Sequence, residues 1–567
     1  MRNITCEAIE PYLRYYGLRS GFEVEVSFGQ YDNIFQEAVG QEAVSGLLDE
    51  QTDCVLVCCN IMVLSPLIYR QYVGVDARDL KAELERLENY FHNVATGIRN
   101  KTKAMILWLS PREFFNPALG ILDYQYANGQ LGLVQEVERL LQEQLRSFGN
   151  AYLVKQDHLL QKIGAERFYD LRHWYLFHCP YSKEAFQLLA EECFIFVRAA
   201  GGKARKCLVL DCDNVLWGGI VGEDGLDGIR LSDTYPGLVY KDFQQQVINL
   251  FKRGVIIALC SKNNEEDVWE IFEKHPDMLL ERGHIAAWRI NWQDKATNLR
   301  ELSEELNIGI DSMVFLDDSP YEIELVRTEV PEVETIQLPA GKITANAGVL
   351  SECRLFDTLV FSAEDSSRGQ MYVAEARRKK LKGQITDLDS YLKTLEMELT
   401  ISLVDEISIP RVAQLTQRTN QFNLTTRRYS DQQISSLAGS DDSDVLYSHL
   451  RDKFGESGII GVCILKYKGE CAMIDVFLLS CRALGRRVED ELLGNALELA
   501  RSKGCRQATA EYLPTRKNIQ VKEFFPLKGF TVVDCNPDGV TRYRLELEPD
   551  GVKKRAACFK QVSVKFN

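Results

Sequence analysis

This chain of 567 residues has no apolar segment long enough to cross a bilayer and no cysteines with Cys-x-x-Cys spacing. The longest apolar stretch, residues 55–64, is interrupted by Asn60 and is far too short to cross a bilayer. The first residues carry charges and do not resemble a signal peptide. The 16 cysteines are scattered without a Cys-x-x-Cys pair, which indicates reduced thiols and no structural zinc. We therefore expect a cytoplasmic protein that makes no membrane contact.

Positive charge is also scarce. The chain has 67 Lys and Arg against 82 Asp and Glu, which gives a net charge of −15. Nonspecific nucleic-acid binding needs clustered positive charge, so we expect no nucleic-acid partner. The hydrophobic content of 45% is typical of globular proteins, and the length predicts about three or four domains.

The most informative segment is an apolar run that ends in two carboxylates. Residues 208–210 are apolar, and Asp211-Cys212-Asp213 follows them directly. Carboxylates at the end of a buried strand can hold Mg²⁺, which prefers oxygen ligands and often binds substrate phosphates too. They can also accept a phosphoryl group or transfer a proton. By itself the pair is weak evidence, because acidic residues also cap helices and close turns.

Two more apolar runs, residues 255–260 and 313–316, end in polar groups that suit the same chemistry. These groups are Ser261, Lys262, Asn263, Asp317 and Asp318. Between the two runs, Lys295 precedes a helical pattern and can supply a positive charge. In open parallel sheets, ligands bind at the carboxyl ends of the strands. We therefore expect the three runs to bring these side chains to one edge of a sheet.

This order of groups resembles the four motifs of the haloacid dehalogenase-like phosphotransferases. The resemblance implies a Rossmann-like parallel sheet and a role for each group. By it the catalytic residues are Asp211 and Asp213, the phosphate binders are Ser261 and Lys295, and the Mg²⁺ ligands are Asp317 and Asp318. Asp211 would be the nucleophile and Asp213 the acid/base. From the residues themselves we also expect Lys262 and Asn263 to bind phosphate, and Asp211 and Asp213 to join the Mg²⁺ ligands.

The segment DCDNVLWGGIVGEDG, residues 211–225, resembles the FkbH-like family more closely, and the likeness extends over nearly the whole chain. The resemblance implies a transferase that takes the glyceryl group of 1,3-bisphosphoglycerate and releases phosphate. The glyceryl group would be loaded as a thioester on a phosphopantetheinylated acyl carrier protein, for antibiotic biosynthesis of the polyketide type. Composition and spacing alone indicate only magnesium-dependent phosphoryl chemistry.

Cys212 bears on that distinction, because a plain phosphatase needs nothing reactive between its two aspartates. A thiolate attacks an acyl phosphate readily, and the resulting thioester could pass to the carrier's thiol. The flanking carboxylates raise a thiol pKa, whereas Mg²⁺ and Lys295 lower it, so the net direction stays open. The alternative is that Cys212 is a small buried filler. We expect it to carry the acyl group.

The insert between Gly219 and Ser261 is short. It spans residues 220–260 and contains a turn-rich piece and one helix, at 241–251. No large cap domain fits, so we expect an open site that a phosphopantetheine arm can enter.

Residues 1–200 predict an α/β layered domain. The expected helices are at 7–16, 79–99, 131–147 and 183–197, and the expected strands are at 23–26, 54–58 and 104–109. The domain resembles SGNH hydrolases, and Asp170 and His173 match their late Asp-x-x-His motif. The early nucleophilic serine is absent, since Arg2-Asn3-Ile4-Thr5 stands in its place. We therefore expect a non-catalytic interaction domain in which His173 is structural.

The catalytic domain is predicted at 201–355, a helical linker at 356–395, and a third domain at 396–555. The third domain resembles GNAT acetyltransferases, an α+β fold that holds coenzyme A pyrophosphate on a turn at a helix N-terminus. The matching turn contains Arg482, Gly485, Arg486 and Arg487. A long side chain at position 487 would hinder a pyrophosphate, so we expect a pantetheine-binding or carrier-docking remnant. A basic cluster in the linker is the best candidate for docking an acidic carrier, or is simply a solvated helix face: Arg377, Arg378, Lys379, Lys380 and Lys382.

Three functions are thus open. The first is a Mg²⁺-dependent glyceryl transferase with phosphatase chemistry. The second is a phosphatase or phosphotransferase that acts on a small phosphorylated metabolite. The third is a non-catalytic scaffold that binds a carrier protein, although the presence of every phosphotransferase motif argues against it.

Overall fold

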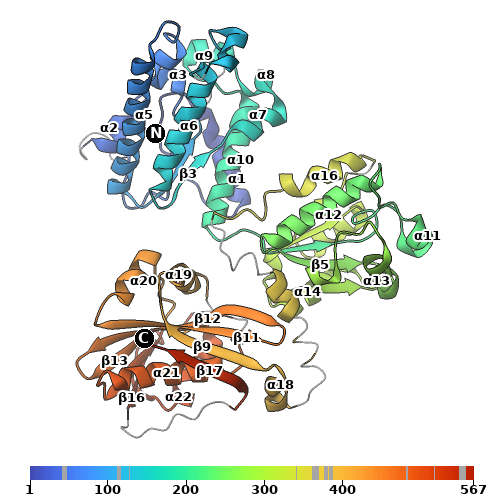
Figure 1. Ribbon diagram of the computed structural model, residues 1–567, viewed down its shortest axis with the longest axis vertical. Coiled ribbons are helices and arrows are strands. Elements are labelled where there is room, and N and C mark those ends of the chain that lie inside the picture. Colours follow the sequence, from blue (N-terminus) through green and yellow to red (C-terminus); the bar gives the residue numbers. More distant parts are fainter. Residues whose placement is uncertain are drawn as a thin grey trace. The chain divides into compact units, whose positions relative to one another are not determined.

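The computed structural model describes residues 1–40, 47–111, 116–126, 128–339, 341–359, 369–375, 378, 381, 387–419, 421–480, 483–515, 517–547 and 557–566. The chain divides into two compact units, Met1–Ala204 with Asp357–Leu359, and Arg205–Phe356 with Val360–Asn567 (Figure 1). In the described parts of the chain, no helix has the length and apolar character that a membrane span needs. The second unit contains two separate sheets, each with its own buried cluster. The finer boundaries at 200, 355 and 395 stay a prediction.

The first unit has a parallel sheet of three strands in the order β1-β2-β3. The strands are β1 (Cys54–Val57), β2 (Met105–Leu109) and β3 (Ala151–Val154). The helices are α1 (Glu10–Arg19), α2 (Ile34–Val39), α3 (Ile61–Leu64), α4 (Pro66–Tyr69), α5 (Ala77–Lys101), α6 (Gln130–Arg146), α7 (Asp157–Ile163), α8 (Ala165–Phe168), α9 (Leu171–Phe177) and α10 (Lys183–Ala200). The predicted α/β character and long helices are therefore present.

One predicted strand of this unit is wrong. Residues 23–26 form no regular secondary structure. Phe22 and Val24 pack against the hydrophobic core, which produces the apolar alternation without a partner strand. A Cβ on Gly17 of α1 would lie 2.3 Å from Val24, so the segment lies directly against this helix. The strand β3 (Ala151–Val154) was not predicted.

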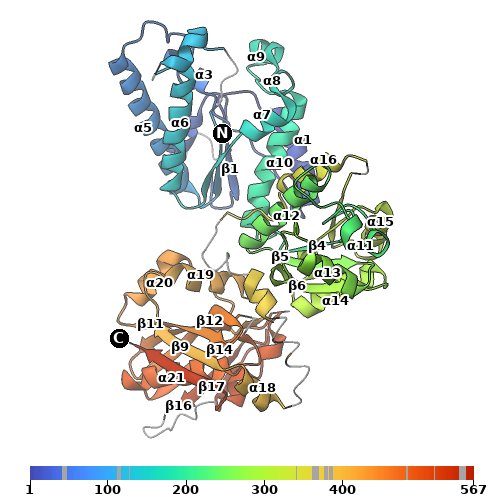
Figure 2. The ribbon, with the colours of Figure 1, turned by 45° about the vertical axis from the view of Figure 1, so that its right-hand side comes forward.

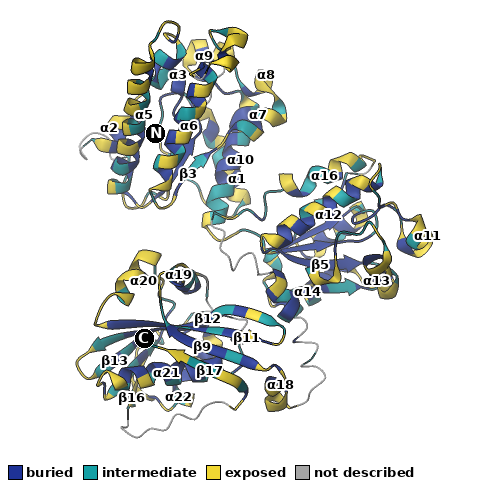
Figure 3. Ribbon diagram, in the orientation of Figure 1, coloured by how far each residue is buried: buried dark blue, intermediate teal, exposed yellow. Residues whose placement is uncertain are grey.

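The second unit begins with a parallel sheet of five strands in the order β6-β5-β4-β7-β8 (Figure 2). The strands are β4 (Cys207–Leu210), β5 (Ile256–Ser261), β6 (Ile285–Ile290), β7 (Met313–Asp317) and β8 (Glu334–Gln337). The helices are α11 (Val221–Gly228), α12 (Gly237–Lys252), α13 (Glu265–Lys274), α14 (Lys295–Leu306), α15 (Pro320–Glu329) and α16 (Ile343–Glu352). Every residue of β4, β5 and β7 is buried, as expected for central parallel strands (Figure 3).

Residues 220–260 are described throughout and contain only α11 and α12 before β5 begins. The expectation that no large cap domain is inserted there agrees with this arrangement.

The C-terminal sheet is mainly antiparallel, in the order β15-β16-β14-β13-β12-β11-β9-β17, with β10 paired to β13. Its strands are β9 (Met397–Leu403), β10 (Phe422–Asn423), β11 (Ser443–Asp452), β12 (Gly455–Lys468), β13 (Cys471–Leu479), β14 (Gln507–Tyr512), β15 (Thr531–Cys535), β16 (Thr541–Glu546) and β17 (Phe559–Lys565). Its helices are α18 (Leu388–Thr394), α19 (Ile409–Arg418), α20 (Asp431–Ala438), α21 (Val488–Ser502) and α22 (Phe524–Leu527). The α+β class predicted for this part is present, and the predicted pair β12 and β13 forms.

Candidate phosphate and metal site

Three parallel strands deliver the polar groups to one edge of the central sheet. Strand β4 pairs with β5 on one side and with β7 on the other, and Leu210 is in register with both Leu259 and Leu316. Asp211 directly follows β4, and Asp317 is the last residue of β7. The strands end at the same level, so polar side chains at their carboxyl ends lie close together.

Asp211, Asp317 and Asp318 form a group that could hold a metal ion. One oxygen of each lies within 4.8 Å of the others. Asp211 and Asp317 are buried. Three carboxylates with one neighbouring ammonium leave an excess of negative charge, and their hard oxygen donors suit Mg²⁺. The residues present therefore fit the expected ion.

The carboxylate of Asp213 lies outside this group, so its predicted contact with the metal ion stays a prediction. Its Oδ1 accepts hydrogen bonds from Trp217 Nε1 at 2.9 Å and from the Val221 amide at 3.1 Å. Its Oδ2 accepts one from Asn263 Nδ2 at 3.0 Å. The chain turns sharply after Asp213, where Asn214 has a φ of 56°. Asp213 is thus held by donors on the loop, and burial raises its pKa.

Lys295 compensates two of the buried carboxylates. It is the first residue of α14, and its Nζ lies 3.0 Å from Asp211 Oδ1 and 2.5 Å from Asp317 Oδ2. Burial alone lowers an ammonium pKa, but the charges of Asp211 and Asp317 raise the pKa of Lys295 above its usual value. Lys295 therefore stays charged beside the cluster. Burial and the charge of Asp211 raise the pKa of Asp317 to about 7.

Ser261 and Asn263 are linked to Asp213. Asn263 Nδ2 donates to Ser261 Oγ at 3.1 Å as well as to Asp213, so the three side chains form one hydrogen-bonded group. The ammonium group of Lys262 does not join them, and its predicted phosphate contact stays a prediction. Its Nζ donates to Glu322 Oε1 at 2.6 Å. Neighbouring residues at a strand end point to opposite sides, which sends Lys262 away.

Cys212, the residue expected to carry the acyl group, is buried. Its side chain has 0% exposure and belongs to the hydrophobic cluster of the central sheet. Burial and the charge of Asp211 raise its pKa well above the usual value, although the Ser261 hydroxyl and Lys295 act in the opposite direction. The thiol lies between two residues whose side chains face the site, so alternation turns it inward. The arrangement matches the alternative of a buried filler.

The structure explains why the loop after Asp213 has the residues it has, which sequence reasoning missed. Trp217 is fully buried and fixes the Asp213 carboxylate through its ring N–H. A Cβ on Gly218 would lie 2.8 Å from the ring of Tyr240, and Gly219 has a φ of +105°. This loop therefore requires glycine at both positions. The only available signal was the motif itself, since propensity cannot show which ring packs there.

The expected pantetheine turn in the C-terminal sheet is occupied by ion pairs. Gly485 has a φ of +74°, and Arg487 has a φ of 58° at the N-cap of α21. Arg486 is buried and pairs with Glu375 and with Asp452, the latter at 3.5 Å. Arg487 pairs with Asp389 at 2.6 Å. Arg486 is therefore engaged inside the protein, whereas the Arg487 pair is partly exposed and its predicted phosphate contact stays a prediction.

Arg482 lies outside the described residues, as do all members of the predicted basic cluster except Arg378. Arg378 is buried and forms two hydrogen bonds to Asp452, at 2.6 and 2.7 Å. It is therefore part of the same internal network and is not a solvated docking residue.

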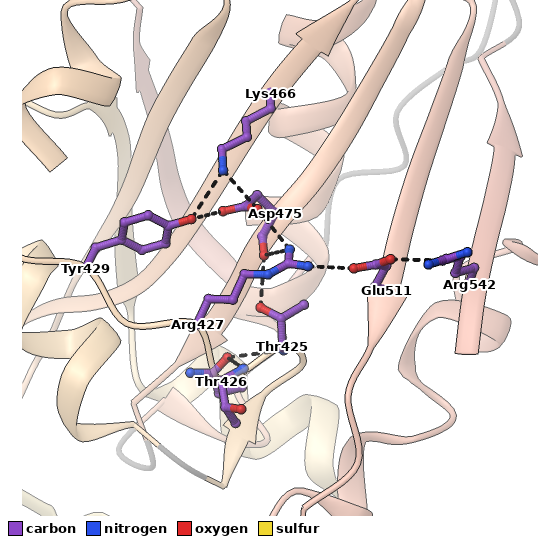
Figure 4. Close-up of polar contacts among 9 residues, drawn as sticks. Thr425, Thr426, Arg427, Tyr429, Lys466, Asp475, Glu511 and Arg542 are labelled. Carbon is purple, nitrogen blue, oxygen red and sulfur yellow. Dashed lines mark hydrogen bonds and ion pairs between the residues drawn. The ribbon is translucent and has the colours of Figure 1, made fainter. Parts of the chain in front are cut away.

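The gap where β13 and β14 separate is closed by the chain itself (Figure 4). The parallel pairing ends at Ile474 and Ala510, and Asp475 follows at a bulge. Arg427 donates to Asp475 Oδ1 at 2.8 Å and to Glu511 Oε2 at 2.6 Å, so it bridges the two diverging strands.

The same gap is filled further along by strand β10. Phe422 is in register with Leu479, and Asn518 donates from Nδ2 to the Asn423 carbonyl at 2.9 Å. Thr425 Oγ1 donates to the Asp475 carbonyl at 2.9 Å. The opening between the strands is thus already occupied by protein atoms.

The pair Asp170 and His173 forms in the first unit. His173 Nδ1 lies 3.2 Å from Asp170 Oδ2, and the His173 side chain is 51% exposed. Asp170 also caps α9 by accepting from the His173 amide. At the place of the missing serine, Thr5 Oγ1 donates to the Phe177 carbonyl at 2.6 Å. This hydroxyl is therefore used in the fold, and the non-catalytic role of the domain stays a prediction.

No protein-family model matches this chain, and no curated protein matches it. Among solved structures, it is similar to the N-terminal part of a Bacteroides fragilis protein that contains a phosphatase domain complexed with Mg. That likeness has 24% identity and a TM-score of 0.56, and it covers 64% of this chain and 93% of the other. It is also similar, at a low score, to the Escherichia coli ribosomal-protein-S18-alanine N-acetyltransferase, with 14% identity and a TM-score of 0.22. This match covers 28% of this chain and 99% of the other. The first likeness shows that the chain shares the fold of the phosphatase-containing protein.

Proposed function

We propose that this chain is a Mg²⁺-dependent enzyme that carries out phosphoryl chemistry on a small phosphorylated substrate. The observation that supports this proposal most is the convergence of Asp211, Asp317 and Asp318 with Lys295 at the carboxyl ends of neighbouring strands. Mg²⁺ held by these three carboxylates would neutralise the charge of a substrate phosphate.

The side chains have separate roles in the proposed reaction. A carboxylate oxygen of Asp211 attacks phosphorus, and the bond from phosphorus to the leaving oxygen breaks. Asp213 gives its proton to the leaving oxygen and then takes one from the water that hydrolyses the aspartyl phosphate. Its hydrogen bonds to Trp217 and Asn263 fix its orientation for this step. Lys295 and Ser261 lie where they could hold phosphate oxygens.

The resemblance to FkbH-like proteins extends the proposal to an acyl phosphate, 1,3-bisphosphoglycerate. In that reaction a thiolate sulfur bonds to the glyceryl carbon, the carbon–oxygen bond of the mixed anhydride breaks, and phosphate leaves. Because Cys212 is fully buried, we propose that the acceptor is the phosphopantetheine thiol of an acyl carrier protein, with no relay through Cys212. A carboxylate of the site takes the thiol proton.

Mass spectrometry of the carrier tests this version. Incubation with Mg²⁺, 1,3-bisphosphoglycerate and a phosphopantetheinylated carrier should add a glyceryl mass to the carrier, and C212A should do so as well. A glyceryl mass on Cys212 itself, lost in C212A, would show that the buried thiol opens and acts as a relay. Phosphate release without any carrier loading would leave a plain phosphatase, and no turnover of either kind would leave a binding scaffold.

A further inference from the structure

A pocket of about 650 Å³ lies on one face of the C-terminal sheet, over β9 and β11. These strands and β17 are neighbours in the sheet (Figures 1 and 2). Leu399 and Ile401 of β9 point into the hydrophobic core, so Thr400 and Ser402 point to the opposite face, into the pocket. The size is that of a pocket for a small organic molecule.

Strand register arranges the polar floor of this pocket in two rows. Ser402 is paired with Tyr447 of β11 and with Lys565 of β17. Thr400 is paired with His449 of β11. Directly paired residues on one face have neighbouring side chains. One row therefore carries an ammonium and two hydroxyls, and the other carries an imidazole and a hydroxyl.

The floor groups have no partners within the described residues. Thr400, Tyr447, His449 and Lys565 line the pocket, and none of their side chains makes a hydrogen bond or ion pair with another residue that the structure describes. Each is thus free to bind a ligand.

The acidic groups of the pocket are already engaged. Asp405 accepts from the Ser408 amide at 2.8 Å and from its hydroxyl at 2.6 Å. Asp444 accepts from the Tyr467 hydroxyl at 2.6 Å and pairs with Lys503 at 2.7 Å. Asp405 keeps its negative charge, because Ser408 is neutral, whereas the charge of Asp444 is compensated by Lys503. Lys565 is the lysine of the pocket lining, and its ammonium has no ion-pair partner among the described residues.

The remaining wall is apolar and includes Leu403, Val404, Ala438 and Ile459, with Ile407 at its rim. Ile407 is 90% exposed, so it offers apolar surface to a bound molecule. We infer that this pocket binds an amphipathic organic anion. The anionic group of the ligand lies at Lys565 and His449. The hydroxyls of the floor form hydrogen bonds with the polar groups of the ligand, and its apolar part lies against Ile407 and Ile459.

Two sources have this chemistry, namely a phosphopantetheine arm and a free acyl carboxylate. Titration calorimetry on the full chain, without Mg²⁺, uses 4′-phosphopantetheine and octanoate as anionic probes and pantetheine as the uncharged probe. We expect saturable binding of at least one anion and binding of pantetheine that is at least about ten-fold weaker, the effect of one lost charge-assisted hydrogen bond. Which of the two anions binds identifies the source.

The substitution K565Q should weaken binding of the anion about ten-fold, and H449Q should weaken it as well. The matched control is K560Q, an exposed lysine on the same strand that pairs with Glu396 and lies outside the pocket lining. The inference is overturned if neither anion binds, if pantetheine binds as tightly, or if K565Q and H449Q bind as tightly as the wild type. The inference does not depend on the proposed function, and all three variants should keep the rate of phosphate release of the wild type.

Discussion

The Nζ of Lys295 lies 2.5 Å from Asp317 Oδ2, and the two residues are 2% and 0% exposed, respectively. The same Nζ lies 3.0 Å from Asp211 Oδ1. One ammonium therefore holds two buried carboxylates from neighbouring strands. A buried pair of this kind is costly to break, because the remaining charges lose their partner.

The substitution K295M should lower the free energy of unfolding by about 3 kcal/mol and abolish phosphate release, because two buried carboxylates lose their counter-charge. Urea unfolding and a phosphate assay measure the two effects. K274M is the control, since Lys274 is an exposed lysine that pairs with Glu270 on the surface of α13. Equal stability of K295M and K274M would contradict the buried pair.

Without metal, stability should fall as the pH rises from about 4 to about 7. Burial and the charge of Asp211 raise the pKa of Asp317 to about 7, whereas an unfolded aspartate has a pKa of about 3.9. In this window the folded protein keeps a proton that the unfolded chain releases, so the contribution is complete below the unfolded pKa and is lost as the pH rises through the folded pKa. The slope is up to about 1.4 kcal/mol per pH unit.

Urea unfolding in EDTA at several pH values checks this sign. D317N cannot ionise and should lose that part of the pH dependence. Burial raises the pKa of Asp213 and Asp318 too, so a weaker slope of the same sign should remain. A wild-type slope in D317N would contradict the assignment.

Mg²⁺ should stabilise the folded protein, because it binds a site that the unfolded chain lacks. At a concentration of 100 times Kd the gain is about 2.7 kcal/mol, which thermal unfolding detects. D318N should weaken the Mg²⁺ effect, since Asp318 is one of the three clustered carboxylates. D311N changes an exposed aspartate in the short turn before β7 and should respond to Mg²⁺ like the wild type. The same Mg²⁺ response in D318N and D311N would contradict the cluster.

The C-terminal sheet should not bind coenzyme A, because Arg427 and β10 fill the gap between β13 and β14. R427M should destabilise the protein by about 2 kcal/mol, since Asp475 is buried and loses a charged donor. R542M removes an exposed arginine that pairs with Glu511 and Asp534 and should cost less. Calorimetric binding of acetyl-coenzyme A to the wild type would contradict the closed gap.

The sequence was sufficient to predict the central strands and their polar ends, because apolar runs that end in Asp, Ser or Lys can be recognised in a single sequence. It did not show orientation at single positions. Cys212 and Lys262 each lie one residue from a site side chain, and only the backbone direction decides that one is buried and the other turns to Glu322.

Contacts between residues that are distant in sequence were the second feature that the sequence could not predict. Arg486 was expected at a phosphate, but its partners Glu375 and Asp452 are distant in sequence. Strand β10 has two residues and no periodic signal, so its insertion beside β13 could not be predicted.

The rate of phosphate release from a small acyl phosphate, measured with Mg²⁺ for the wild type and for D211N, tests the central claim most directly. We predict a decrease of at least about 10³-fold in D211N, because the attacking carboxylate is lost while D311N stays at the wild-type rate. Equal rates in the wild type and D211N would contradict phosphoryl chemistry at this site.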